Sequence, residues 1–150
     1  MLDQLQNVFA SFQKNEVRYL VIGGIAAVLY GVPRATFDLD VLIEATPDNA
    51  ERLLRAMNEA GLGTALLTSV ADLLSNEITI FTDRVRLDVQ TSTPGITFAA
   101  AWARRVAMTY KGQELQVVSL ADLIASKRAA GRDVDLADVR ILESKDVNSK

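Results

Sequence analysis

The stretch at residues 21–40, VIGGIAAVLYGVPRATFDLD, decides the fold. The apolar run at residues 17–22 has the composition of a buried β-strand, and it stops at Gly23 and Gly24. A short helix of small residues is expected next. Residues 37–44 then alternate between apolar and polar side chains, which is the two-residue period of a strand with one apolar face. This order predicts a strand, a glycine turn, a helix and a second strand.

Two carboxylates lie on the second of these strands, and a third lies further along the chain. Asp38 and Asp40 are two residues apart, so the strand period places both on one face. Asp88 belongs to a predicted strand at residues 85–90 and lies opposite its apolar side chains. If the strands are neighbours, the carboxylates converge, and at about 4 Å each pair repels by roughly 4 kcal/mol at an effective dielectric of about 20. Such a cluster must take up protons or bind cations.

The residue types that are absent from the chain narrow the chemistry. It has no cysteine and no histidine, which excludes disulfides, zinc–thiolate sites and nucleophiles activated by histidine. A metal would be held mainly by oxygen, which points to Mg²⁺ or Mn²⁺ rather than Zn²⁺. Two such metals held by shared aspartates would suit phosphoryl or nucleotidyl transfer. The alternative is that the aspartates form the ordinary polar face of a strand.

Length and composition favour one globular domain. A chain of 150 residues with 49% hydrophobic and 23% charged side chains can build a core without disulfides or metals. We expect an α+β fold, with a mixed sheet of about five strands and helices packed mainly on one face. The helices should cover the face that carries Phe37, Leu39, Leu87 and Val89. The domain is expected over residues 1–143, with a last helix ending at Leu142 and a polar tail at residues 144–150.

Charge and hydropathy give little indication of a partner. The net charge is −3, which does not favour an extended nucleic-acid track or an anionic membrane surface. The apolar stretch at residues 19–30 is too short to span a bilayer, and it contains the glycine pair. We therefore expect no membrane contact and a cytoplasmic location.

The glycine pair and a nearby arginine are candidates for phosphate binding. Gly23 and Gly24 lie where a strand passes into a helix, so their backbone N–H groups could approach a phosphate. The alternative is a tight turn with close packing of the helix on the strand. Arg34 could bind a phosphate through its two-pronged guanidinium, or it could be a solvated loop arginine.

The C-terminal part adds one lysine and two further carboxylates. Lys127 lies on a predicted helix at residues 120–130 with apolar neighbours, which makes it a candidate site residue. The alternative is a lysine whose aliphatic stem lies along the surface and whose ammonium group reaches water. Asp135 and Asp138 are three apart on the next predicted helix, at residues 133–142. They could form a solvated face, or they could cap the helix and pair with Lys127 or Arg132.

The order of these motifs resembles the core signature of the DNA polymerase β-like nucleotidyltransferase superfamily. That signature is an apolar strand, two small residues opening a helix, and Arg-x-Thr-x-Asp-x-Asp on the next strand, matched here by Arg34, Thr36, Asp38 and Asp40. Asp88 would be the third carboxylate. Residues 119–127, 131–132 and 135–138 are similar to the small bacterial branch of the superfamily, which includes toxins of the abortive-infection type.

The resemblance implies a metal site and a phosphate site. Asp38 and Asp40 would bind both metals, and Asp88 would bind the catalytic metal and help to activate the acceptor. Gly23 and Gly24 would cradle the β- and γ-phosphates of an NTP such as ATP. The superfamily often has Gly-Ser where this chain has the glycine pair, so a serine hydroxyl near the phosphates is missing.

The resemblance also assigns supporting residues. Arg34 and Thr36 would support the phosphates and the aspartate strand, and Lys127 would contact the triphosphate. Three further residues would order the C-terminal helices or assist acceptor activation; these are Arg132, Asp135 and Asp138.

Two hypotheses about function follow. In the first, the protein is a metal-dependent nucleotidyltransferase that moves NMP from an NTP to a hydroxyl of an RNA end, a protein or a small molecule. In the second, it is a non-catalytic module that binds a nucleotide or a partner, as a homodimer or within a toxin–antitoxin system. Convergence of Asp38, Asp40 and Asp88 within reach of one metal, beside the glycine pair, would favour the enzyme.

Overall fold

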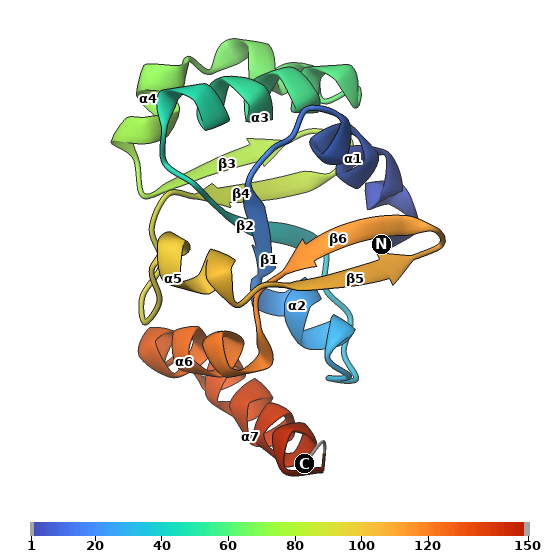
Figure 1. The fold of residues 1–150 in the computed structure, drawn as a ribbon, viewed down its shortest axis with the longest axis vertical. Helices are drawn as coiled ribbons and strands as arrows, with labels where there is room; N and C mark the ends of the chain where they lie inside the picture. The colour runs from blue at the N-terminus through green and yellow to red at the C-terminus, as the bar shows by residue number, and fades with distance from the viewer. Residues whose placement is uncertain (1, 149–150) are drawn as a thin grey trace.

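A six-stranded mixed sheet forms the centre of the protein in a computed structural model that describes residues 2–148 (Figure 1). The strand order is β3-β4-β2-β1-β6-β5. Neighbours β2 and β4 are parallel, as are β1 and β6, and the other pairs are antiparallel. The strands are β1 (Tyr19–Ile22), β2 (Asp38–Ile43), β3 (Ile78–Thr82), β4 (Arg86–Gln90), β5 (Val106–Tyr110) and β6 (Gln113–Val117). The predicted α+β class is confirmed.

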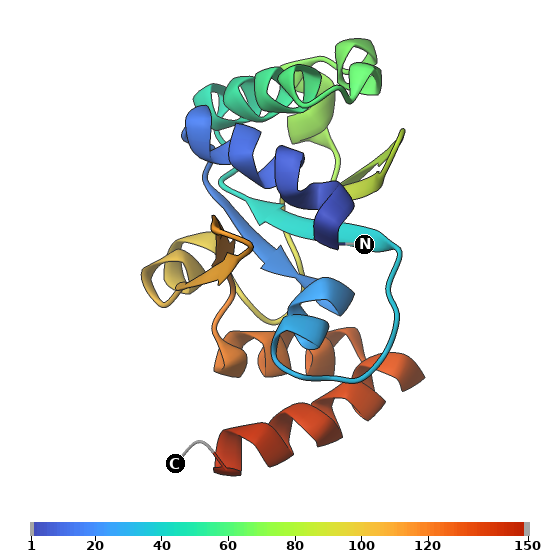
Figure 2. The ribbon, with the colours of Figure 1, turned by 90° about the vertical axis from the view of Figure 1, so that its right-hand side faces the viewer.

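The helices lie in two groups with the sheet between them, and not mainly on one face as expected from the sequence. Figure 1 shows α3 and α4 at one end of the molecule and α6 and α7 at the opposite end. In Figure 2, α1 runs alongside α3, and α2 lies between the sheet and α6. The helices are α1 (Leu2–Lys14), α2 (Gly23–Leu29), α3 (Pro47–Glu59), α4 (Val70–Ser75), α5 (Phe98–Ala103), α6 (Leu120–Ala130) and α7 (Asp133–Asn148), with a 3₁₀ turn η1 at Gly63–Leu67. Among the described residues, no helix is both long and apolar enough to cross a membrane.

The apolar face of the central strands forms the core. Leu39 and Leu87 are register partners across β2 and β4, as are Val41 and Val89, and all four are fully buried. Helix α1 packs on this face through aromatic side chains, and the ring of Phe12 lies 5.0 Å from that of Tyr19. Burying such apolar surface is the main driving force of folding. Because side chains alternate along a strand, the same packing leaves the aspartates on the other face.

Three further expectations from the sequence are corrected. The sheet has six strands rather than five, because the antiparallel pairs β3–β4 and β5–β6 form its two edges. Phe37 lies before β2 and is 79% exposed, so it is not part of the core face; it lines a surface hollow with Val28 and Tyr110. Helix α7 continues to Asn148, past the predicted end at Leu142. Leu142 is fully buried, and Glu143 pairs with Arg128 of α6, so contacts with α6 extend past that position.

Candidate active site

The parallel pairing of β2 and β4 brings the predicted carboxylates to one face of the sheet. In the register of these strands Asp40 lies opposite Asp88, and Asp38 lies opposite Arg86. All four side chains line a cleft of about 350 Å³. The opposite wall of the cleft consists of Gly23 at the start of α2, Lys127 of α6, Arg132 in the turn between α6 and α7, and Asp135 of α7.

Asp40 is the most perturbed carboxyl group of the cleft. Burial raises its pKa to about 7, and the charges of Asp88 and Asp38 act in the same direction. Asp40 is the register partner of Asp88, and because like charges nearby disfavour ionisation, Asp40 retains its proton up to about neutral pH. The positive charge of the neighbouring Arg132 favours the ionised form of Asp40, but it offsets this rise in pKa only partly.

Arg86 compensates the charge of the two outer carboxylates. Its Nε lies 3.0 Å from Oδ1 of Asp88 and 3.7 Å from Oδ2 of Asp38, and its Nη2 lies 3.2 Å from Oδ2 of Asp88. The hydrogen bonds from Arg86 to Asp88, and the charge of that carboxylate, raise the pKa of the guanidinium above its usual value. The protein thus supplies its own cation to the carboxylate cluster.

The donor atoms of the cleft suit Mg²⁺ or Mn²⁺, which prefer carboxylate oxygens. Asp40 and Asp88 are already adjacent, and Asp38 lies two residues away on the same strand face. Within residues 2–148, however, no three acidic side chains are arranged closely enough to hold one metal ion. The three aspartates thus share one cleft with Gly23, but they do not form a preassembled three-carboxylate metal site.

Close packing explains the glycine pair. Gly23 has a φ of +68°, and a Cβ there would lie 2.5 Å from Oδ2 of Asp40. A Cβ on Gly24 would lie 2.8 Å from the hydroxyl oxygen of Thr36 and 3.2 Å from Nη2 of Arg34. The tight-turn interpretation is confirmed, and phosphate binding stays a prediction.

A network of ion pairs begins in the opposite wall of the cleft and extends away from the cleft to Asp138 and Arg34. The ammonium group of Lys127, whose side chain is 4% exposed, is 2.8 Å from Asp138 and 3.5 Å from Asp135. Arg34 donates two hydrogen bonds to Asp138, and Arg132 donates two to Asp135. Burial alone would raise the pKa of each carboxyl group, but the hydrogen bonds and charges of these cations outweigh it and lower both pKa values. The network joins α6 and α7 to the loop that precedes β2.

The network decides between several of the alternatives left open by the sequence. Asp135 and Asp138 are buried, so the solvated-face alternative is wrong and the predicted pairing with Lys127 and Arg132 is confirmed. Lys127 does not extend to water, and Arg34 is not a solvated loop arginine. The helix that carries Lys127 begins and ends as predicted, with a Ser119 cap and a left-handed Gly131.

The structure does not place every predicted residue in the cleft. Arg34 and Thr36 line a neighbouring hollow with Phe37, and Asp138 lies behind the cleft wall. Arg86 was not singled out from the sequence, although it shares a strand face with Asp88 at a two-residue spacing. The two-residue spacing could have indicated the contact between Arg86 and Asp88. The contact between Arg86 and Asp38 follows only from the register of β2 and β4.

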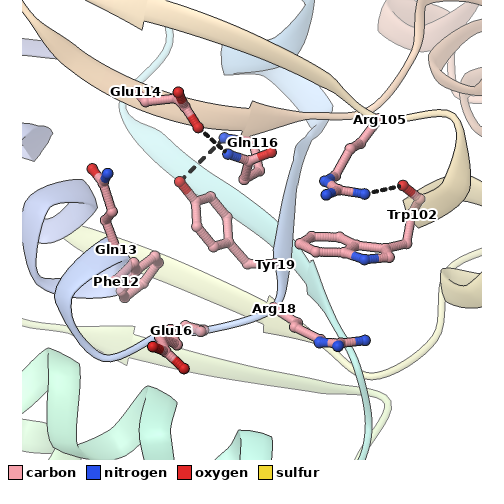
Figure 3. A pocket seen from close by; sticks show the side chains of 10 residues that line it. Phe12, Gln13, Glu16, Arg18, Tyr19, Trp102, Arg105, Glu114 and Gln116 are labelled. Carbon is pink, nitrogen blue, oxygen red and sulfur yellow. Dashed lines mark hydrogen bonds between the residues drawn. The ribbon is translucent and has the colours of Figure 1, made fainter.

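A second hollow, of about 290 Å³, contains none of the predicted site residues (Figure 3). The guanidinium carbon of Arg105 lies 4.0 Å from the centre of the Trp102 ring, and the Tyr19 hydroxyl accepts a hydrogen bond from the backbone N–H of Gln116. Burial raises the pKa of Tyr19 to about 12, so this phenol is a poor base at neutral pH. The second hollow is therefore a weaker candidate for catalysis.

A mixed sheet with a glycine turn packed against Asp-x-Asp, and a third aspartate on the adjacent parallel strand, is consistent with the nucleotidyltransferase fold. Residues 1–148 match the model of the family described as "Nucleotidyltransferase of unknown function (DUF6036)", and the chain belongs to this family. Among curated proteins, no relative matches the chain.

Proposed function

We propose that the cleft transfers NMP from an NTP to a hydroxyl acceptor and releases pyrophosphate, with Mg²⁺ or Mn²⁺ as cofactor. The observation that carries the proposal is the facing pair of Asp40 and Asp88, with Asp38 on the same face and Gly23 against Asp40. The family assignment supports nucleotidyl transfer in general. The metal, the nucleotide and the acceptor are part of the proposal.

In this proposal the three aspartates hold the divalent cations. Asp38 and Asp40 would be shared ligands, and Asp88 would complete the site nearer to the acceptor. When bound, the cations would neutralise charge that develops on the phosphate oxygens. Asp40 would give up its proton as they bind, because a nearby cation favours the ionised carboxylate.

Backbone and cationic groups on the other wall would position the triphosphate. Gly23 lies at the cleft surface with no side chain to hinder a phosphate. Arg132 lines the same cleft and is 73% exposed, so its guanidinium can meet both Asp135 and a ligand. Lys127 would add positive charge within this wall, while its pairs with Asp135 and Asp138 hold it in place.

The transfer step is a displacement at the α-phosphorus. The acceptor oxygen would form a bond to that phosphorus while the bond to the bridging oxygen of the β-phosphate breaks, and pyrophosphate would leave. The proton of the acceptor hydroxyl would pass to Asp88, which faces the cleft. The catalytic contribution of the protein would be positioning and charge neutralisation rather than a covalent intermediate.

One observation favours a second function, a non-catalytic nucleotide-binding or partner-binding module, which could belong to a toxin–antitoxin system. Arg86 already pairs with Asp38 and Asp88, and no three acidic side chains of residues 2–148 are arranged to hold a metal. A module of this kind would bind its ligand but would not turn over.

The experiment that separates the two functions uses each of the four NTPs, labelled at the α-phosphate. The protein is incubated with Mg²⁺ or Mn²⁺ and cell extract, and labelled RNA, protein and small molecules are separated. Asp88→Asn should abolish the label transfer, whereas Asp72→Asn, the same change at an exposed position of α4, should not. A transfer that survives Asp88→Asn would contradict the proposed site, and nucleotide binding without any transfer would favour the module.

A further inference from the structure

The guanidinium of Arg86 is bound to two of the three carboxylates that line the cleft. It meets both oxygens of Asp88 at 3.0 and 3.2 Å, and one oxygen of Asp38 at 3.7 Å. Its place follows from the backbone, because Arg86 is the register partner of Asp38 and precedes Asp88 by two residues on one strand. The pairing of β2 and β4 therefore brings Arg86 next to both aspartates.

These are the oxygen atoms that the proposed function assigns to the divalent cation. A guanidinium donates its hydrogen bonds in fixed directions, so the two-pronged contact fixes the orientation of the Asp88 carboxylate. A divalent cation at the same oxygens would meet the positive charge of Arg86 at short range and be repelled. The Arg86 guanidinium and a divalent cation therefore cannot both bind these carboxylate oxygens without weakening each other's contacts.

We propose that Arg86 is a positioning residue that competes with the divalent cation for Asp38 and Asp88. The inference rests on the proposed function only for the identity of the metal site. The Arg86 side chain is 44% exposed, so it has room to turn toward solvent when the cation enters. Until then it holds the two carboxylates in an ordered, charge-compensated arrangement.

The competition has a consequence for the order of binding. Without nucleotide, the cation must displace Arg86 into water and loses part of its binding free energy. With a triphosphate present, phosphate oxygens can accept the displaced guanidinium, because arginine forms strong charge-assisted hydrogen bonds to phosphate. The cation and the nucleotide should therefore bind better together than either does alone.

The test measures the affinity of the metal-free protein for Mn²⁺ alone, by electron paramagnetic resonance of the unbound ion. In Arg86→Gln the dissociation constant should fall about tenfold or more, because no charge-assisted hydrogen bonds have to be broken. Arg84→Gln is the matched control, since it removes the same charge from the same hairpin, where Arg84 donates to the carbonyl of Ala60. The control should bind Mn²⁺ as the wild type does.

Circular dichroism first checks that each variant is folded, and the Mn²⁺ affinity then tests the competition. An unchanged or weaker affinity of Arg86→Gln for Mn²⁺, or no binding by either protein, overturns the competition. If the wild type nevertheless transfers nucleotides, the proposed function stands without this inference. If Arg86→Gln binds Mn²⁺ more tightly but no protein transfers nucleotides, the inference stands and the proposed function falls.

Discussion

Replacing Asp40 by asparagine should change the pH dependence of stability in a defined direction. The pKa of Asp40 is raised from 3.8 to about 7 in the folded protein, chiefly by burial. Between these pH values the folded protein retains a proton that the unfolded chain has released, so the free energy of unfolding falls as the pH rises. At about 1.4 kcal/mol per pH unit, the total loss is roughly 4 kcal/mol by pH 8.

Asparagine has nearly the same shape as aspartate but cannot ionise. Asp40→Asn should therefore match the wild type near pH 4 and exceed its free energy of unfolding by roughly 2–4 kcal/mol at pH 8. Urea unfolding in metal-free buffer, followed through the fluorescence of Trp102, the single tryptophan of the sequence, measures this difference. Asp72→Asn, at an exposed position, should show no such trend. A constant difference for Asp40→Asn between pH 4 and 8 would refute the raised pKa of this carboxyl group.

Two further substitutions test the packing around the cleft. Gly23→Ala should lower the melting temperature and displace Asp40, because the added Cβ would lie 2.5 Å from the Asp40 carboxylate. In the control Gly63→Ala the added Cβ meets nothing within 4 Å, so the melting temperature should stay the same or rise. Asp138→Asn should lower the free energy of unfolding by about 3 kcal/mol, because it leaves Arg34 without its carboxylate and the buried Lys127 with only Asp135, at 3.5 Å. Asp133→Asn, at an exposed position of the same helix, should cost far less. Urea unfolding at pH 7 measures the second pair, and equal effects within either pair would contradict the contacts described above.

The sequence was sufficient to predict the strands of the site because alternation is a local property. The two-residue period placed Asp38 and Asp40 together, and the apolar neighbours of Asp88 placed it on the corresponding face of its own strand. The motif order then indicated that the two strands are adjacent, which the parallel pairing confirms. The same alternation wrongly assigned Phe37 to the core, because the strand begins one residue later.

The contacts between distant elements could not be predicted from local patterns. Arg34 and Asp138 are separated by 104 positions and meet only because α7 packs on α6 beside the loop that precedes β2. The contact of Arg86 with Asp38 depends on the register of β2 and β4, and a shift of one residue would have separated them. The extra turns of α7 depend on its packing against α6, which helix propensity alone does not reveal.

The most direct test of the proposed site is a crystal structure with Mn²⁺ and an NTP analogue that cannot be cleaved at the α-phosphate. Anomalous scattering locates manganese independently of any assumption about its ligands. We predict manganese at the oxygens of Asp38, Asp40 and Asp88, with the triphosphate extending toward Gly23 and Arg132. Manganese and nucleotide bound elsewhere, for example at the hollow beside Trp102, would contradict this prediction.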